Sequence, residues 1–278
     1  MQHLKRIITS LIGAPLLLLF IYKASYLMFS VFVFIISIIA LYEYFKVTLN
    51  KEHTTRKSPV VLIAFITLII INYGAYVASF DYIVFALVFN FICVSALSLP
   101  EFKDNSKMYR TVSIQIQSSI YIPLFLSFLI FIRNSHTVPN DNYGVLMIIL
   151  LCFLVGMGDT GAYYIGRNFG KRKIIPWVSP NKTLEGYLGG LIISISTGCV
   201  YKYYLLKDLE WIPSIIFFAS VAIAAPLGDL FESTLKRAGD IKDSGTILPG
   251  HGGMLDRIDA LLFAIPVTYF FMKYIFKL

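Results

Sequence analysis

Residues 144–165 read GVLMIILLCFLVGMGDTGAYYI, and Asp159 is the only charged residue among them. An apolar run of about 20 residues is long enough to cross the hydrocarbon core of a bilayer as a helix. A spanning helix also satisfies its own backbone hydrogen bonds, which lipid tails cannot do. This stretch therefore predicts a transmembrane helix that carries one acid near its end.

Similar apolar runs recur along the whole chain. Hydrophobic residues make up 57 % of it and charged residues only 14 %, against about 25 % charged in soluble domains. Its mean hydropathy is +0.73. We predict an all-α, polytopic integral membrane helical bundle with about nine transmembrane helices, at approximately 7–22, 25–45, 59–78, 81–99, 111–132, 144–165, 185–205, 211–230 and 258–276.

The distribution of positive charge predicts the orientation. With nine spans, 18 of the 24 Lys and Arg residues fall on the side that holds the N-terminus. Cytoplasmic loops carry such an excess, so we expect the N-terminus in the cytoplasm and the C-terminus outside. This placement explains the net charge of +8 without nucleic-acid binding, and we expect no nucleic-acid partner.

The chain divides into two halves of different character. Residues 1–142 hold about five expected helices and few polar motifs, whereas residues 143–278 hold about four helices and two polar cytoplasmic loops, 166–184 and 231–257. Glu43 and Asp81 of the first half read as helix-end residues. We expect the second half to be catalytic.

The longest polar motif is residues 233–259, STLKRAGDIKDSGTILPGHGGMLDRID. Glycines on both sides of His251 free the backbone to turn its N–H groups toward an anion. Cations and hard oxygen ligands accompany them, which suits a phosphate-rich ligand with a divalent metal. The groups in question are Lys236, Arg237, Lys242, Arg257, Asp240, Asp243, Asp256, Asp259, Gly250, Gly252 and Gly253.

Two pairs of acids have helical spacing. Asp229 and Glu232 are three residues apart, with Ser233 on the same face, and Asp256 and Asp259 repeat that spacing. Two neighbouring helices that present paired oxygens can hold a divalent ion between them. The alternative is that these acids sit at helix ends and pair with Lys236 or Arg257.

Asp159 lies in residues 156–161, GMGDTG, which match the dinucleotide-binding pattern G-x-G-x-x-G. A strand before the motif and an acid about 20 residues later are both missing, so close helix packing explains the small residues better. An acid within a membrane helix costs about 2.5–3.5 kcal/mol and usually has a function.

The loop after this helix is rich in cations and turn residues. Arg167, Lys171, Arg172 and Lys173 read mainly as a loop that orients the chain in the membrane, and Asn181 or Thr183 as a helix cap. Lys182 and Glu185 stand beside the helix start, where a lysine is unfavourable unless an anion binds there. No motif for a covalent nucleophile occurs, so the expected chemistry is positioning and charge neutralisation of a phosphoryl group.

These residues resemble the phosphatidate cytidylyltransferase (CDP-diacylglycerol synthase) family. The family signature S-x-[aliphatic]-K-R-x4-K-D-x-[small]-x2-[apolar]-P-x-H-G-G-[apolar]-x-D-R-x-D is matched throughout residues 233–259, and residues 158–163, 179–186 and 228–233 look like its other blocks. The resemblance implies transfer of CMP from CTP to phosphatidate. It also implies a homodimer that requires Mg²⁺ and leaves room for a second cation.

Carried over by motif, Asp229 and Asp256 are the expected principal Mg²⁺ ligands, with Asp159, Glu232, Asp243 and Asp259 as secondary candidates. The expected catalytic set is Asp229, Asp256, Lys236, Arg237, Lys242, Asp243, His251 and Arg257. The expected substrate-binding set is Ser179, Lys182, Glu185, Ser233, Gly252 and Gly253.

Other functions stay open at this point. CTP-dependent activation of another lipid, such as an ether lipid, or polyprenol phosphorylation could use the same scaffold. A transporter of an anionic solute could use Asp159 with the basic loops, but transporter sites lie near the midplane and often show inverted repeats. We expect a bacterial inner membrane with the active site facing the cytoplasm; a eukaryotic internal membrane is the alternative.

Overall fold

The computed structural model describes residues 2–49, 57–101, 105–135, 142–245 and 252–278. Every element in these ranges is helical, and their only extended pairing is the single bridge between Lys173 and Thr183. The predicted all-α class is confirmed.

In its described residues, the first half contains six α-helices and two short helical segments. The π-helical segment η2 holds Pro123, joins α5 to α6 and makes them one continuous rod, as expected where a proline removes a backbone donor. The elements are α1 (Gln2–Lys23), α2 (Tyr26–Thr48), α3 (Lys57–Tyr76), α4 (Phe80–Ser98), η1 (Leu99–Glu101), α5 (Asn105–Ser119), η2 (Ile120–Leu124) and α6 (Phe125–Arg133).

The described part of the second half contains four longer helices and a terminal π-helical segment. These are α7 (Tyr143–Phe169), α8 (Leu184–Leu205), α9 (Trp211–Ala238), α10 (Leu255–Phe270) and η3 (Phe271–Phe276).

The described residues contain eight helices long and apolar enough to cross a membrane, and one shorter apolar helix at Gly13–Lys23. These nine segments match the nine expected spans in order and approximate position. The polytopic membrane fold is thereby confirmed.

Three helices extend beyond their expected ends toward the polar loops. α7 runs to Phe169, α9 runs to Ala238, and α10 begins at Leu255. In α9 the last turn contains Lys236 and Arg237, whose positive charge is favourable at a helix C-terminus. The residues from 229 to 237, part of which was expected as loop, therefore lie on one helix and keep a fixed spacing.

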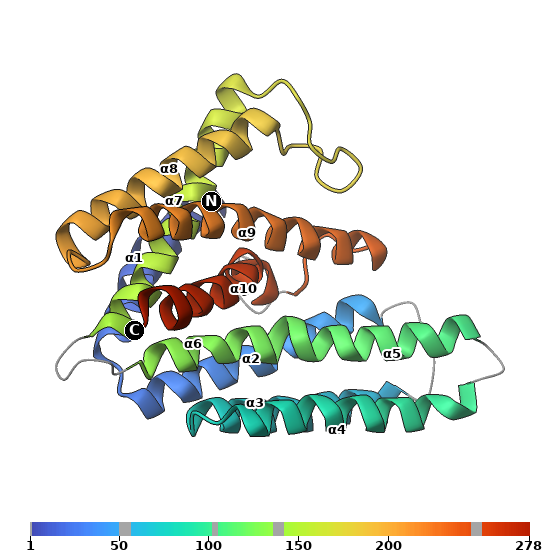
Figure 1. Ribbon diagram of the computed structural model, residues 1–278. Coiled ribbons are helices and arrows are strands. Elements are labelled where there is room, and N and C mark those ends of the chain that lie inside the picture. The colour runs from blue at the N-terminus through green and yellow to red at the C-terminus, as the bar shows by residue number, and fades with distance from the viewer. Residues whose placement is uncertain (1, 50–56, 102–104, 136–141, 246–251) are drawn as a thin grey trace.

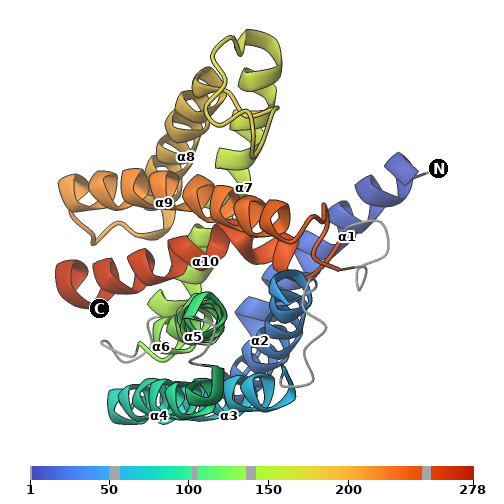
Figure 2. The same cartoon turned by 90° about the vertical axis from the view of Figure 1, so that its right-hand side faces the viewer.

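The helices stack in layers (Figures 1 and 2). The α7–α8 pair lies on one side of α9, α10 lies on the other side of α9, and the helices α2 to α6 follow beyond α10. The C-terminal ends of α2, α4 and α9 lie at one end of the bundle, toward the right in Figure 1. The α8–α9 connection lies at the opposite end.

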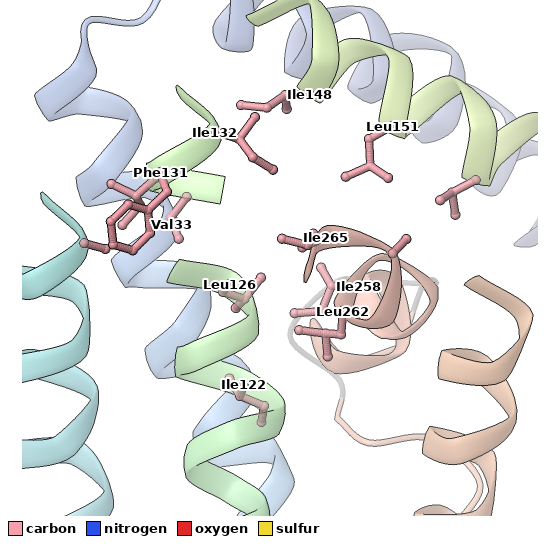
Figure 3. Packing of buried hydrophobic residues seen from close by; sticks show 14 of the residues in the cluster. Val33, Ile122, Leu126, Phe131, Ile132, Ile148, Leu151, Ile258, Leu262 and Ile265 are labelled. Carbon is pink, nitrogen blue, oxygen red and sulfur yellow. The ribbon is translucent and has the colours of Figure 1, made fainter. Parts of the chain in front are cut away.

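One hydrophobic core runs through both halves of the chain. Figure 3 shows Ile122 and Leu126 pointing toward Ile258 and Leu262 of α10, and Ile132 of α6 beside Ile148 of α7. The side chain of Leu262 is fully buried in this cluster. The second half therefore packs its apolar faces against helices of the first half.

Small residues hold α7 and α8 close together. A Cβ on Gly190 would lie 2.7 Å from the backbone oxygen of Gly158, and one on Gly186 would lie 2.7 Å from that of Ala162. Such contacts are possible only where side chains are absent, as in membrane helix pairs that use small residues. In the motif around Asp159, a Cβ on Gly161 would lie 2.6 Å from the side chain of Ile193 on α8, so this glycine serves helix packing, as the sequence analysis favoured over a nucleotide-binding turn; a Cβ on Gly156 has nothing within 4 Å.

Candidate active site

A cavity of about 740 Å³ opens between α7, α8, α9 and the loop at 170–183. One part of its wall is apolar, with Leu154, Val155, Ala222, Ala225 and Pro226. The polar lining includes four residues expected in the site, which are Asp159, Ser179, Lys182 and Asp229. The fold thus brings together residues from two helices and a loop that are distant in sequence.

Asp229 and Lys182 form an ion pair in the wall of this cavity. Lys182 Nζ lies 2.6 Å from Asp229 Oδ2, and Ser233 Oγ donates a longer hydrogen bond of 3.4 Å to Asp229 Oδ1. Asp159 on α7 is close enough to interact electrostatically with both Asp229 and Lys182. Lys182 therefore offsets two negative charges at the cavity wall.

The loop at 170–183 has a defined internal structure. Thr183 caps α8 by accepting a hydrogen bond of 3.2 Å from Gly186 N–H, which confirms one of the two expected caps. The exposed carboxylate of Glu185 accepts hydrogen bonds from the N–H groups of Lys171 and Arg172, at 2.9 and 3.1 Å. Glu185 thus ties the basic loop to the start of α8.

Two of the four basic residues that the sequence favoured as orienting charges line the cavity. All four are exposed, but Arg167 and Lys173 line the cavity and Lys171 and Arg172 do not. Their positive charge adds to that of Lys182. The cavity is therefore suited to an anionic group beside an apolar one.

A second polar cluster joins α9 to α10. Lys236 Nζ lies 2.5 Å from Glu232 Oε2 and 2.7 Å from Asp256 Oδ1. Glu232 is fully buried. Pairing of these acids with Lys236 was the alternative considered from the sequence, and the structure shows it for Glu232 and Asp256.

Asp256 also organises the backbone before α10. Its Oδ2 accepts hydrogen bonds from Ser244 N–H at 3.0 Å, Ser244 Oγ at 2.9 Å and Gly253 N–H at 2.8 Å. Gly252 has a φ of +82°, a left-handed conformation that favours glycine, as expected for this motif. His251 and Gly250 lie outside the described residues.

Glu43 of α2 reaches the same segment, although the sequence predicts only a helix-end role for it. Its side chain is 1 % exposed, and Oε2 accepts hydrogen bonds from Leu255 N–H at 2.8 Å and Ser244 Oγ at 3.2 Å. The signal in the sequence was an acid inside an apolar run, which is costly without a partner. Asp81, by contrast, lies in the first turn of α4 as expected.

The two clusters are neighbours. Asp259 on α10 interacts electrostatically with Asp229 and Asp159 of the first cluster and with Lys236 of the second. Arg237 Nε donates a hydrogen bond of 3.3 Å to the backbone oxygen of Val178, in the loop beside the cavity. Lys242, Asp243 and Arg257, which the sequence also placed in the site, are exposed to solvent. They are close in sequence to the residues of the second cluster.

The acidic residues fit a hard divalent cation in donor chemistry. Asp159, Asp229 and Asp259 come from three helices and interact electrostatically, and carboxylate oxygens are preferred Mg²⁺ ligands. Within the described ranges, no three acidic, histidine or cysteine side chains form a complete metal-binding set. Mg²⁺ commonly takes one or two carboxylates and completes its coordination with substrate phosphates and water.

Comparison with known proteins gives matches along nearly the whole chain. A model of the cytidylyltransferase family matches residues 4–275. A phosphatidate cytidylyltransferase of Bacillus subtilis (strain 168) is 32 % identical over 268 residues, which cover 96 % of this chain and 97 % of that protein. One of Thermotoga maritima is 36 % identical over 280 residues, covering 98 % and 97 %. One of Staphylococcus haemolyticus is 46 % identical over 123 residues, covering 44 % and 47 %.

Proposed function

The chain belongs to the cytidylyltransferase family, and on that premise we propose that it is a phosphatidate cytidylyltransferase whose reaction takes place at the α7–α8–α9 cavity. The enzyme transfers CMP from CTP to phosphatidate and gives CDP-diacylglycerol and pyrophosphate, a step of phospholipid biosynthesis. The observation that carries the proposed location is the Lys182–Asp229 pair at the wall of a cavity that is partly apolar.

The cavity suits a substrate with a phosphate head and acyl chains. Its apolar wall, which includes Leu154, Ala222 and Pro226, can contact hydrocarbon, while Lys182 and Arg167 can contact phosphate oxygens. A lipid phosphate and a nucleotide triphosphate are both strongly anionic, so cations must offset their repulsion. The two clusters supply these cations in Lys182, Lys236 and Arg237.

In the proposed reaction, an oxygen of the phosphatidate phosphate attacks the α-phosphorus of CTP. The bond from that phosphorus to the oxygen bridging to the β-phosphorus breaks, and pyrophosphate leaves with the electron pair. The attacking phosphate is already largely ionised near neutral pH, so a general base is dispensable. The chain's own contribution is therefore to bring two anions together and to neutralise charge.

We propose Mg²⁺ as the cofactor, with Asp229 and Asp256 as principal ligands and Asp159, Glu232 and Asp259 as neighbours; a second cation remains part of the proposal. When bound, Mg²⁺ supplies charge neutralisation at the triphosphate. An incoming phosphate attracts Lys182 and Lys236, and this leaves carboxylate oxygens of Asp229 and Asp256 available as ligands. The ion pairs thus keep the acids neutralised before the substrates bind.

We further propose that the site faces the cytoplasm of a bacterial inner membrane, where CTP is available, and that the protein is a homodimer. The excess of Lys and Arg on the side that bears the motif loops supports the orientation. The dimer rests on the family resemblance alone, and the mass of the purified protein in detergent tests it.

The direct test is radiolabelled CTP with phosphatidate and detergent-purified protein, with and without Mg²⁺. We expect labelled CDP-diacylglycerol and one pyrophosphate per CMP transferred, only when the lipid, CTP and Mg²⁺ are all present. An ether-lipid phosphate and a polyprenol serve as alternative acceptors. A CDP-linked lipid with pyrophosphate from the ether-lipid phosphate, or polyprenyl phosphate with CDP from the polyprenol, but no product from phosphatidate, would refute the substrate. Full activity of Asp229→Asn would refute the proposed ligand.

A further inference from the structure

We propose that Glu43 is a positioning residue for CMP transfer: from α2 it fixes the backbone that orients Asp256. This backbone, called the segment below, comprises the described residues 244–245 and 252–255. This inference rests on the proposed function, because Asp256 belongs to the proposed site. Glu43 itself lies in the first half of the chain, outside the signature motif.

A single oxygen of Glu43 contacts two residues of the signature motif, Ser244 and Leu255. Oε2 accepts hydrogen bonds from Leu255 N–H at 2.8 Å and from Ser244 Oγ at 3.2 Å. Leu255 is the first residue of α10, and the first N–H groups of a helix have no partner within the helix. A buried carboxylate at this position satisfies one of them and is favoured by the helix dipole.

Ser244 passes this constraint on to Asp256. Ser244 Oγ lies 3.2 Å from Glu43 Oε2 and 2.9 Å from Asp256 Oδ2, and its one proton can be donated to either oxygen. Ser244 N–H also donates to Asp256 Oδ2, at 3.0 Å. If Glu43 is removed, Ser244 Oγ and Leu255 N–H lose the acceptor that they share. Ser244 is then less well positioned to orient the carboxylate of Asp256.

The segment leaves room for this carboxylate and little else. A Cβ on Gly253 would lie 2.5 Å from Glu43 Oε2 and 2.7 Å from Oε1, and a Cβ on Gly245 would collide with Oε1. Both glycines are buried. The backbone at Gly245 and Gly253 therefore packs directly against the Glu43 carboxylate, as expected for a residue that sets the position of its surroundings.

Two conservative variants separate reach from charge. Glu43→Gln keeps the length of the side chain and one accepting oxygen, which can serve both donors, but it removes the charge. Glu43→Asp keeps the charge but is one methylene shorter, so its oxygens cannot keep both contacts. Ser37→Ala is the matched control, because Ser37 is a buried polar residue of α2 that donates only within its own helix.

A positioning role predicts that kcat depends on the length of the side chain at position 43 and not on its charge. We expect Glu43→Gln to retain kcat within about threefold and Glu43→Asp to lose about tenfold or more, because one or two hydrogen bonds that orient the segment are broken. The KM for phosphatidate should change less than about twofold in both. If Glu43 acted on stability alone, kcat would fall in proportion to the unfolding temperature. Glu43→Gln should lower the unfolding temperature at least as much as Glu43→Asp does, because Glu43→Gln removes the negative charge at the start of α10.

Hydrogen exchange of the segment provides a readout independent of activity. In Glu43→Asp, the amides of Ser244, Gly253 and Leu255 should exchange faster than in the wild type, whereas Ser37→Ala should leave them unchanged. The double variant Glu43→Asp with Ser244→Ala should lose little more activity than Glu43→Asp alone, because both act on the same contact to Asp256.

The outcomes decide the inference in either direction. Given that the wild type transfers CMP, three results overturn the inference. Glu43→Asp could keep its full kcat, or its segment amides could exchange at the wild-type rate. The losses of activity in the double variant could also be additive. If Glu43→Asp does not fold, Glu43→Gln decides: a loss of kcat beyond about tenfold refutes control by reach. Failure of the wild-type protein to transfer CMP would instead refute the proposed function.

Discussion

Replacing Gly190 by alanine puts a methyl group where α8 touches the backbone of α7. The added Cβ would lie 2.7 Å from the backbone oxygen of Gly158 and 3.0 Å from the Cβ of Ala162, whereas ordinary contact begins at 3.4 Å. Backbone atoms of a packed helix cannot turn aside as a side chain can. The two helices must therefore separate locally by about 0.7 Å, the difference between 3.4 and 2.7 Å.

The free-energy cost follows from two opposing effects. Overpacking of this kind costs about 1–3 kcal/mol. Alanine is favoured over glycine within a helix by about 0.8–1 kcal/mol. Gly156→Ala isolates the second effect, because a Cβ on Gly156 has nothing within 4 Å. We expect Gly190→Ala to be less stable than Gly156→Ala by about 1–3 kcal/mol, with a lower unfolding temperature by about 2–4 °C for each kcal/mol.

Activity should fall together with this packing. Gly158 and Gly190 both line the cavity, and Gly158 precedes Asp159, so separation of α7 and α8 moves Asp159 relative to Lys182. A misplacement approaching 1 Å at a reacting centre costs up to about a hundredfold, and we expect kcat/KM for CMP transfer to drop about tenfold. The measurements are thermal unfolding in detergent and the CTP assay. Equal unfolding temperatures and equal kcat/KM for Gly190→Ala and Gly156→Ala would refute the reasoning.

Three further predictions concern the loop at 170–183. Lys182→Met should lower CMP transfer about tenfold to a hundredfold, because it leaves Asp229 without its cation, while Lys182→Arg should restore part of it; equal rates would contradict the role of the pair. Glu185→Gln weakens the acceptor for two loop N–H groups, so trypsin should cleave the basic loop several-fold faster, and unchanged cleavage would mean that the loop is held otherwise. A cysteine introduced at Trp177, which is 80 % exposed, should react with an impermeant maleimide in inverted vesicles and not in intact cells; labelling from outside would reverse the proposed orientation. The last experiment uses a background without Cys93, Cys152 and Cys199.

The order and number of helices could be predicted from the sequence because each apolar run has the length that a bilayer requires. Their ends could not. α9 continues beyond its apolar run, because Glu232 and Lys236 lie one turn apart and neutralise each other. Apolar length alone does not register such a pair.

The candidate site was predictable as a set of residues but not as an arrangement. The motif identified Asp229, Asp256 and Lys182, yet the structure pairs Asp229 with Lys182 and Asp256 with Lys236. Glu43 was missed because its partner Leu255 is 212 residues away along the chain, and only the three-dimensional packing brings the two together. The one indication in the sequence was that Glu43 is an acid inside an apolar run, where an unpaired carboxylate is costly.

The hydrophobic core shared by both halves limits how this enzyme can be re-engineered. A minimal catalyst cut at residue 142 would expose to lipid tails the faces of α10 that now meet Ile122 and Leu126 (Figure 3). It would also leave the Leu255 amide without an acceptor, and hydrocarbon cannot replace one. Chimeras between relatives should therefore exchange matched helices from both halves, and grafting the signature helices onto a foreign membrane scaffold would transplant the motif without its support.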